Sequence, residues 1–335
     1  MMPAPSHLGP TQEPRSRVAA VAVPITVQRL VVSLDGSRLA EAVLPIAARL
    51  AEAFGATIAL LHVIEQDAPF RIHGEPHLVT RLEAEAYLAQ LARQLAAAGR
   101  LVEYHVHEVP VGNVARSIAA HAEEQRSDLV LLSTHGAGGI RDVLWGSIAQ
   151  QVLQLSHRPT LLVRARANTE AVPGFTPRTI MVSLDGTAAG EAALPLARTL
   201  AHALDVHLRL VMVVPTLETI QGEQLPQATF LPSTTRVLLD AQGEQAAAYL
   251  EHLAASMRST GVPAFAEVRR GSPVAELATG AAEHTDGLVV VATHGRAGLQ
   301  AIWSPSVAAR LLKRTHAPVL LVPIVEPDYR SAIPS

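Results

Sequence analysis

The sequence contains no cysteine and only one lysine, Lys313, among its 27 Lys and Arg residues. Without cysteine, thiol nucleophiles, disulfides and cysteine-based zinc or iron–sulfur sites are excluded. The single lysine lies in the run Leu-Leu-Lys-Arg-Thr-His. Chemistry that depends on a lysine amine, such as a Schiff base or the phosphate-binding lysine of kinases, is therefore disfavoured.

Aromatic residues are also few, with 2 Trp, 4 Tyr and 5 Phe in 335 residues, and the net charge is only −3. Nucleic acid is not expected as a partner, because its recognition uses basic stripes and aromatic stacking platforms. No apolar run approaches the ~20 residues that span a bilayer. We therefore expect no membrane association and a cytoplasmic location. Residues 1–27 are Pro-rich and are expected to form a disordered leader.

The sequence does contain an internal repeat. Val-Ser-Leu-Asp-Gly at 32–36 recurs at 182–186, and Thr-His-Gly at 134–136 recurs at 293–295. The change in offset between these matches indicates an insertion in the second copy, near residues 215–235. The spacing between the copies is the size of a whole domain, so the chain is a tandem duplication. We expect domains at 28–165 and 178–325, a linker at 166–177 and a tail at 326–335.

Each copy alternates short apolar runs with amphipathic helical runs. In the first copy the predicted strands lie at 29–34, 57–64, 102–107, 129–133 and 160–163. This pattern predicts an α/β fold of two tandem doubly wound domains, each a five-stranded parallel sheet flanked by helices. A ligand would lie beyond the carboxyl ends of the strands. Pro45 and Pro195 fall in the first helix of each copy, where a proline bends the helix unless it opens a new turn.

Two groups of residues at the predicted strand ends suit a ligand. A glycine-rich loop runs from Gly136 to Gly146 and is followed by Ser147 at a helix start. It can surround a phosphate with backbone N–H groups, or it can simply form a turn and a helix cap. Asp35 and Asp185 end the first strand of each copy. Each can accept a hydrogen bond from an adenine amino group or a ribose hydroxyl, or can cap the following helix.

Together these residues resemble the universal stress protein family over nearly all of residues 28–325. The family motif reads Gly, two residues, Gly, nine residues, Gly and then Ser or Thr. Here Ser133 takes the first place and Gly136 the second, and after nine intervening residues Gly146 and Ser147 complete the motif. The resemblance implies that the first copy binds ATP or a related adenine nucleotide, with Mg²⁺ alongside the phosphates. The implied contacts are Asp35, Val63, Leu132, Ser133, Gly136, Gly146, Ser147 and Ile148.

The second copy departs from this motif. Ala292 replaces its first glycine, and Pro305 replaces the glycine before Ser306. Proline has no N–H to donate and fixes φ near about −65°, so we expect the second copy to bind a nucleotide weakly or not at all. Arg296 could offset part of this loss through a bidentate phosphate contact. A second site would use Asp185, Val213, Gly295, Arg296 and Ser306.

The resemblance implies a regulatory nucleotide-binding protein of the stress response, and not a dedicated enzyme. It also implies that the two copies pack as an intramolecular pseudo-dimer, with a homodimer as a further option. The alternatives are a slow ATPase or phosphotransferase, for which His135 is the only candidate base, and a nucleotide-free scaffold. His105 and His107 share one face of a predicted strand, as a metal pair would, but no third ligand is evident and no metal site is predicted.

Overall fold

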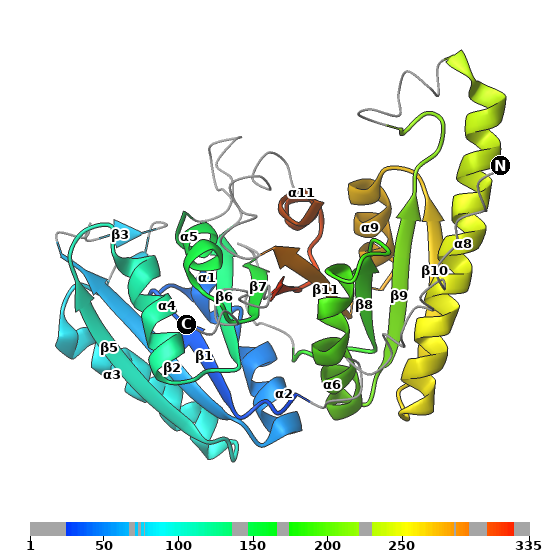
Figure 1. Ribbon diagram of the computed structural model, residues 1–335. Helices are drawn as coiled ribbons and strands as arrows, with labels where there is room; N and C mark the ends of the chain where they lie inside the picture. Colours follow the sequence, from blue (N-terminus) through cyan, green and yellow to red (C-terminus); the bar gives the residue numbers. More distant parts are fainter. Residues whose placement is uncertain are drawn as a thin grey trace, which may run out of the picture.

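The computed structural model describes residues 25–66, 71–72, 75–76, 78–135, 147–165, 174–220, 230–284, 286–294 and 307–324. The two copies form one ten-stranded sheet with helices on both faces (Figure 1). Within each copy the strands of this large sheet are parallel, so the predicted α/β class is confirmed.

The first half of the structure has the strand order β5-β2-β1-β6-β7. The order reverses between β1 and β6, which is where a doubly wound sheet opens a ligand crevice. Its elements are β1 (Arg29–Ser33), α1 (Arg38–Glu41), α2 (Leu44–Phe54), β2 (Thr57–Glu65), β3 (Arg71–Ile72), β4 (Glu75–Pro76), α3 (Arg81–Ala97), β5 (Val102–Val109), α4 (Val114–Glu124), β6 (Leu129–His135), α5 (Ser147–Leu155) and β7 (Thr160–Ala165). β3 and β4 form a separate antiparallel pair.

The second half repeats this topology in the order β10-β9-β8-β11-β12. Its elements are β8 (Thr179–Leu184), the 3₁₀ helix η2 (Gly190–Ala193), α6 (Leu194–Leu204), β9 (His207–Val214), α8 (Pro232–Ser259), β10 (Ala264–Arg270), α9 (Pro273–Ala282), β11 (Gly287–His294), α11 (Val307–Arg314) and β12 (Val319–Ile324). The corresponding crevice lies between β8 and β11.

The central strands are buried on both sides, as their apolar runs predict. All seven residues from Ile58 to Ile64 of β2 are buried. One core layer lies between the sheet and helices α2, α3, α6 and α8, and the other lies between the sheet and α4, α5, α9 and α11. Each layer contains residues of both halves, so the halves share their core.

The two sheets join along β7 and β12, which pair in the antiparallel direction. Leu162 faces Val319 and Leu161 faces Leu320 across this pairing, which we call the seam. Nothing in the sequence indicated that the last strand of each copy would join two five-stranded sheets into one.

Each proline in the first helical segment opens a new helix. α1 ends at Glu41, and α2 begins at Leu44 with Pro45 in its first turn. In the second half, η2 precedes α6, which places Pro195 in the same position. A proline in the first turn has no hydrogen-bond partner to lose, so the helix is interrupted before the proline and not bent at it.

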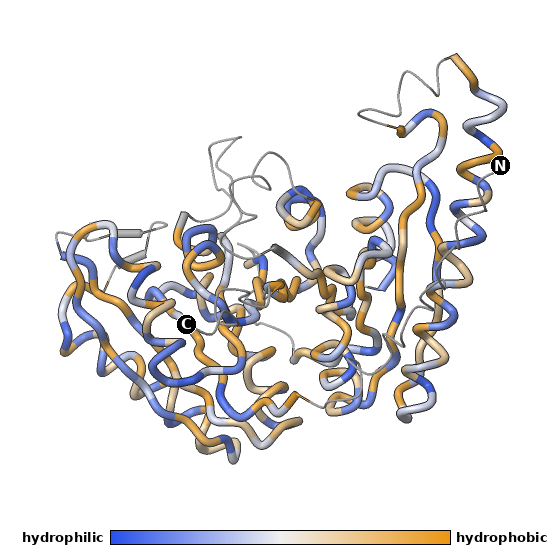
Figure 2. The backbone as a smooth tube through the Cα atoms, in the orientation of Figure 1, coloured by the Kyte–Doolittle hydropathy of each residue, from blue (hydrophilic) through white to orange (hydrophobic). Residues whose placement is uncertain are grey.

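The insertion in the second copy lengthens one helix. α8 has 28 residues, whereas α3 at the same place in the first half has 17. Phe230, Leu231, Val237 and Leu238, at the amino end of α8, are exposed, and this end projects beyond the sheet (Figures 1 and 2). None of the helices in the described residues combines the length and the apolarity needed to cross a bilayer.

Candidate functional site

The two aspartates lie directly after the first strand of each half, in turns of the same geometry. Asp35 Oδ1 accepts hydrogen bonds from the backbone N–H of Ser37 at 2.9 Å and from its hydroxyl at 2.6 Å. Asp185 Oδ1 accepts the same pair from Thr187, at 2.9 and 2.6 Å. Ser37 is the residue that caps α1, through a hydrogen bond from the backbone N–H of Ala40. Asp35 therefore positions the helix cap and is not the cap itself.

In the first half, a leucine and a histidine occupy the α3 side of the β1 end. The Leu78 side chain lies against Gly36, so close that a Cβ at Gly36 would be 2.7 Å from Leu78 Cδ1. His62 is fully buried, with Nδ1 2.8 Å from the carbonyl oxygen of Leu34 and Nε2 3.4 Å from that of Leu78. Gly36 has φ +88°, which a side chain would strain. These contacts hold the segment before α3 against the β1 end.

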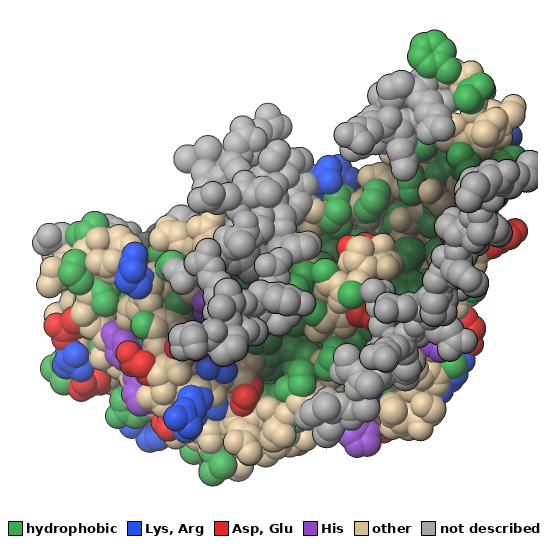
Figure 3. Space-filling model, in the orientation of Figure 1, with side chains coloured by type: hydrophobic (Ala, Val, Ile, Leu, Met, Phe, Trp, Pro, Cys, Tyr) green, Lys and Arg blue, Asp and Glu red, His purple; other side chains and the backbone are tan. Residues whose placement is uncertain are grey.

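In the second half, a cavity of about 710 Å³ lies at the carboxyl ends of the strands. It is lined from β8, β9, β11, α8, α9 and α11, and its walls are mainly apolar. Asp185, Gln242, Gln245 and Thr293 add polar groups. Figure 3 shows hydrophobic side chains gathered in the visible part of the recess beside α8. Met212, which takes the place of His62 in the repeat, lines this cavity, so the two halves differ at one equivalent wall position.

The structure brings several predicted site residues of the first half to neighbouring strand ends. Val63 and Leu132 are buried, and Leu132 is paired with Ser33 of β1. The Ser133 hydroxyl donates to the carbonyl oxygen of Leu39, 2.7 Å away, which ties β6 to α1. Ile148 packs partly buried against the core on the α5 face.

The predicted phosphate-binding residues mostly lie outside the described part of the chain. These are Gly136, Gly146, Gly295, Arg296 and Ser306. Ser147 begins α5, but its side chain is also outside the description. In the second half, Asp185 and Val213 both line the cavity. The structure therefore describes the base and ribose end of the predicted sites, and the phosphate end stays a prediction.

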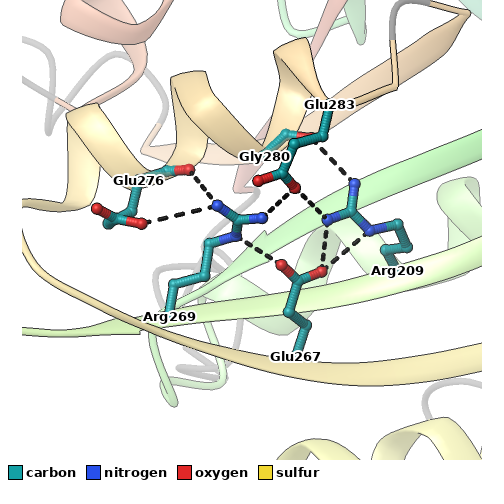
Figure 4. Close-up of polar contacts among 6 residues, drawn as sticks. All are labelled: Arg209, Glu267, Arg269, Glu276, Gly280 and Glu283. Carbon is teal, nitrogen blue, oxygen red and sulfur yellow. Dashed lines mark hydrogen bonds and ion pairs between the residues drawn. The ribbon is translucent and has the colours of Figure 1, made fainter.

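A network of charged residues that the sequence analysis missed lies between α9 and the outer strands of the second half (Figure 4). Arg209 of β9 donates to Glu267 of β10 from Nη2 at 2.6 Å and to the carbonyl oxygen of Gly280 at 3.0 Å. Arg269 contacts Glu267 at 2.5 Å and also pairs with Glu283. Arg269 Nη1 also lies 3.6 Å from Glu276 Oε2. We call these five charged residues the arginine network.

The arginine network keeps its central carboxylate ionised. Burial raises the pKa of Glu267, but hydrogen bonds from Arg209 and Arg269 outweigh burial and leave that pKa below its ordinary value. The network could have been suspected from Arg209, because this arginine interrupts the otherwise apolar strand sequence around it. Within the described residues, no group of three or more His, Cys, Asp or Glu side chains is arranged to hold a metal ion.

Comparisons with known proteins give a consistent result. A model of the universal stress protein family matches residues 26–164 and 176–323. A universal stress protein of Mycolicibacterium smegmatis is 27% identical over 311 residues, which cover 88% of this chain and 96% of that protein. The universal stress protein YxiE of Bacillus subtilis is 26% identical over 145 residues, covering 41% of this chain and 98% of its own length. The crystal structure of a universal stress protein from Archaeoglobus fulgidus aligns with a TM-score of 0.64 and 16% identity, covering 89% of this chain and 98% of that one.

Proposed function

Because the chain belongs to the universal stress protein family, we propose that it binds an adenine nucleotide at the carboxyl ends of its strands. The proposed ligand is ATP or a related nucleotide, with Mg²⁺ at its phosphates. The proposed role is that of a nucleotide-dependent regulator of a cytoplasmic stress response, without dedicated catalysis. The two halves then act as an intramolecular pseudo-dimer.

The second-half cavity is the observation that carries this proposal. Its volume of about 710 Å³ falls within the range of roughly 300–1,000 Å³ typical of small-molecule sites, and its walls combine apolar surface with a few polar groups. Adenine has two flat apolar faces, which suit Met212 and Val213. The carboxylate of Asp185 can accept a hydrogen bond from a ribose hydroxyl or from the adenine amino group.

The motif and the cavity favour different halves. The first half carries Gly146, whereas the second carries Pro305 at the equivalent place, so phosphates are predicted to bind better in the first half. The cavity favours binding of the base and ribose in the second half. We therefore propose that the second half is a site in its own right, which gains less from the phosphates of its ligand than the first half does.

Calorimetric titration with ATP, AMP and adenosine tests this assignment. Asp35→Asn and Asp185→Asn form a matched pair, because asparagine keeps an Oδ1 acceptor for the turn but removes the charge. Loss of a hydrogen bond to a charged group costs roughly 1.5–3 kcal/mol, so each variant should weaken binding in its own half by at least about tenfold. The proposal fails if the wild-type chain binds none of the three ligands.

The small molecules that the purified protein releases on denaturation separate the alternatives. Released ATP supports the regulatory role. Released ADP, together with turnover of added ATP, would indicate a slow ATPase. A protein that releases nothing and also fails to bind added nucleotide would indicate a scaffold.

A further inference from the structure

Three imidazole rings lie close together between β5 and α4 of the first half. His105 and His107 lie on β5, and the structure adds His121 from α4. The ring centroid of His121 is 4.8 Å from that of His105 and 4.7 Å from that of His107. His107 Nδ1 also lies 3.1 Å from the Ser117 hydroxyl. We call the three histidines the histidine cluster.

The cluster is built to be neutral. His121 is 1% exposed, and its Nε2, like that of His105, is buried without a hydrogen-bond partner. Burial, then the neighbouring His107 and His105, and then Arg29 lower the pKa of His121 to about 4. Burial lowers the pKa of His105 and of His107 as well. A proton on His121 would therefore place a buried charge between two other imidazoles.

Among the described residues, no acidic group raises the pKa of His121. On β5, Glu103 is 3.6 Å from His105 Nε2, but it is already paired with Arg29 of β1. Glu124 of α4 raises the pKa of His107, and Arg81 of α3 lowers it. The neighbouring β2 presents the apolar side chains of Ala59, Leu61 and Val63 to the same core layer, and the sequence of α5 contains no titratable residue.

The arginine network occupies the same place in the second half. Leu61 pairs with His105, and Val211, its counterpart in the second copy, pairs with Glu267. In the same register, Arg269 corresponds to His107, and Gly280 of α9 corresponds to His121 of α4. The second half thus fills with permanent charges the space that the first half fills with imidazoles. The pKa of Glu267 at the centre of the network is lowered. Outside the network, burial, then His284 and Arg209, lower the pKa of His207 on β9, which packs against Phe265 of β10.

We propose that the histidine cluster is a proton-operated switch that loosens α4 from β5 in mildly acidic solution, while α9 of the second half stays packed against β10. The core residues Ala115, Ile118 and Ala122 of α4 belong to the same packed cluster as Ala149 and Val152 of α5. α5 starts directly after the predicted phosphate loop. Acid should then also lower the nucleotide affinity of the first half, a consequence that rests on the proposed function.

The direction of the effect follows from proton linkage. An imidazole whose pKa is lower in the folded protein than the ordinary 6.5 stabilises the closed form fully above that value. This stability is lost progressively as the pH falls from about 6.5 towards about 4. For His121 alone, the open-to-closed ratio should rise by about 30-fold between pH 7.5 and pH 5, and by up to about 300-fold at lower pH.

Hydrogen–deuterium exchange of the full chain without nucleotide tests the switch. Peptides from α9 and β10 serve as the internal reference, because the chemical exchange rate itself depends on pH. Between pH 7.5 and pH 5, peptides from α4 and β5 should lose about 30-fold in protection relative to this reference. Equal changes in both halves would overturn the proposal.

Two further measurements separate the switch from a general effect of acid. His121→Leu should abolish the relative loss in α4, whereas the control His157→Gln, at an exposed histidine outside the cluster, should keep it. If His121→Leu does not fold, NMR titration of the wild-type imidazoles decides, since a buried histidine that titrates near 6.5 contradicts the switch. Nucleotide titration at pH 7.5 and pH 5 then tests the link to binding, and its failure leaves the exchange result intact.

Discussion

The two halves have the same strand order and the same register, yet they fill equivalent spaces with different chemistry. Under the outer strands, the first half places the histidine cluster and the second half the arginine network. Gly280 makes this exchange possible because it has no side chain. A Cβ at Gly280 would lie 3.1 Å from Arg269 Cζ, so the guanidinium group packs where the first half has His121. The backbone pairing of the strands is therefore the same in both halves, whereas the side chains packed between the outer strands and the covering helix differ in charge.

The ligand ends of the two halves differ in the same way. In the first half Leu78 packs against Gly36 and His62 lies beside the Leu78 carbonyl oxygen, whereas in the second half Met212, at the position equivalent to His62, lines a cavity. The more complete phosphate motif lies in the first half, and the cavity described above lies in the second. The two halves should therefore contribute differently to stability and to nucleotide binding.

The largest expected effect comes from matched truncations in the shared core. Leu60 of β2 and Leu210 of β9 occupy equivalent positions in the two copies, and both are fully buried. Leu60→Ala and Leu210→Ala should each lower the free energy of unfolding by about 2–5 kcal/mol, through lost burial and the cavity left behind. Because the halves share one sheet and core, differential scanning calorimetry should show a single shifted transition for each variant. Two separate transitions, with only the altered half shifted, would show that the seam does not couple the halves.

The next effect sharpens the electrostatic contrast. Arg209→Met leaves the partly buried Glu267 and the exposed Glu283 without this partner, and should destabilise the protein by about 2–3 kcal/mol. The control is Arg158→Met in the first half, which removes a more exposed ion pair with Glu123 and should cost about 1 kcal/mol or less. Urea unfolding at pH 7.5 measures both. Equal losses of stability in the two variants would mean that burial of the arginine network does not strengthen its ion pairs.

A reciprocal exchange tests the predicted binding asymmetry. Gly146→Pro should weaken nucleotide binding to the first half by at least about tenfold, because an N–H donor to a charged phosphate is lost. Pro305→Gly should strengthen the binding of ATP to the second half more than that of adenosine. Calorimetry with both ligands separates the halves. Unchanged dissociation constants for both variants would remove the phosphate role of these loops.

The smallest expected effect concerns the two longest helices. α3 begins with a capping box, in which the Thr80 hydroxyl accepts from the backbone N–H of Glu83 and the Glu83 carboxylate accepts from that of Thr80. The N-cap of α8 is Leu231, which makes no side-chain cap hydrogen bond. Thr80→Ala should cost about 1 kcal/mol, and Leu231→Ala should change stability very little. Chemical unfolding of both variants measures the difference, and an equal cost would show that the cap is not responsible.

The sequence predicted the elements of the fold well, because their signals are local. Apolar runs located the five large-sheet strands of the first copy closely, with differences confined to the strand ends, and the repeat indicated two copies of one topology. The short antiparallel pair β3–β4 was not predicted. The seam could not be predicted in this way. The apolar run from Thr160 to Val163 predicts a buried strand but does not indicate its second partner. Its pairing with β12 depends on how the two halves are placed in space.

The positions of the candidate site residues at the strand ends follow from the chain and were predicted, whereas contacts that depend on packing were missed. Asp35 and Asp185 stand at strand ends, which the sequence pattern marks directly. His121 joins His105 and His107 only because α4 crosses β5, and no spacing along the chain encodes that contact. Leu78 likewise reaches Gly36 from a segment that is distant in the sequence, beyond α2 and β2.

The seam also has a consequence for how the two halves can change over time. An interface within one polypeptide forms at any dilution, since the covalent tether holds its two sides at an effective concentration on the order of millimolar. In an assembly of identical subunits, a substitution at a two-fold interface is necessarily made on both sides. Here each side of the seam is encoded separately, so one half can acquire a proton-sensitive layer while the other acquires a salt-paired one. The tandem chain can thus hold two differently specialised halves in a fixed one-to-one ratio.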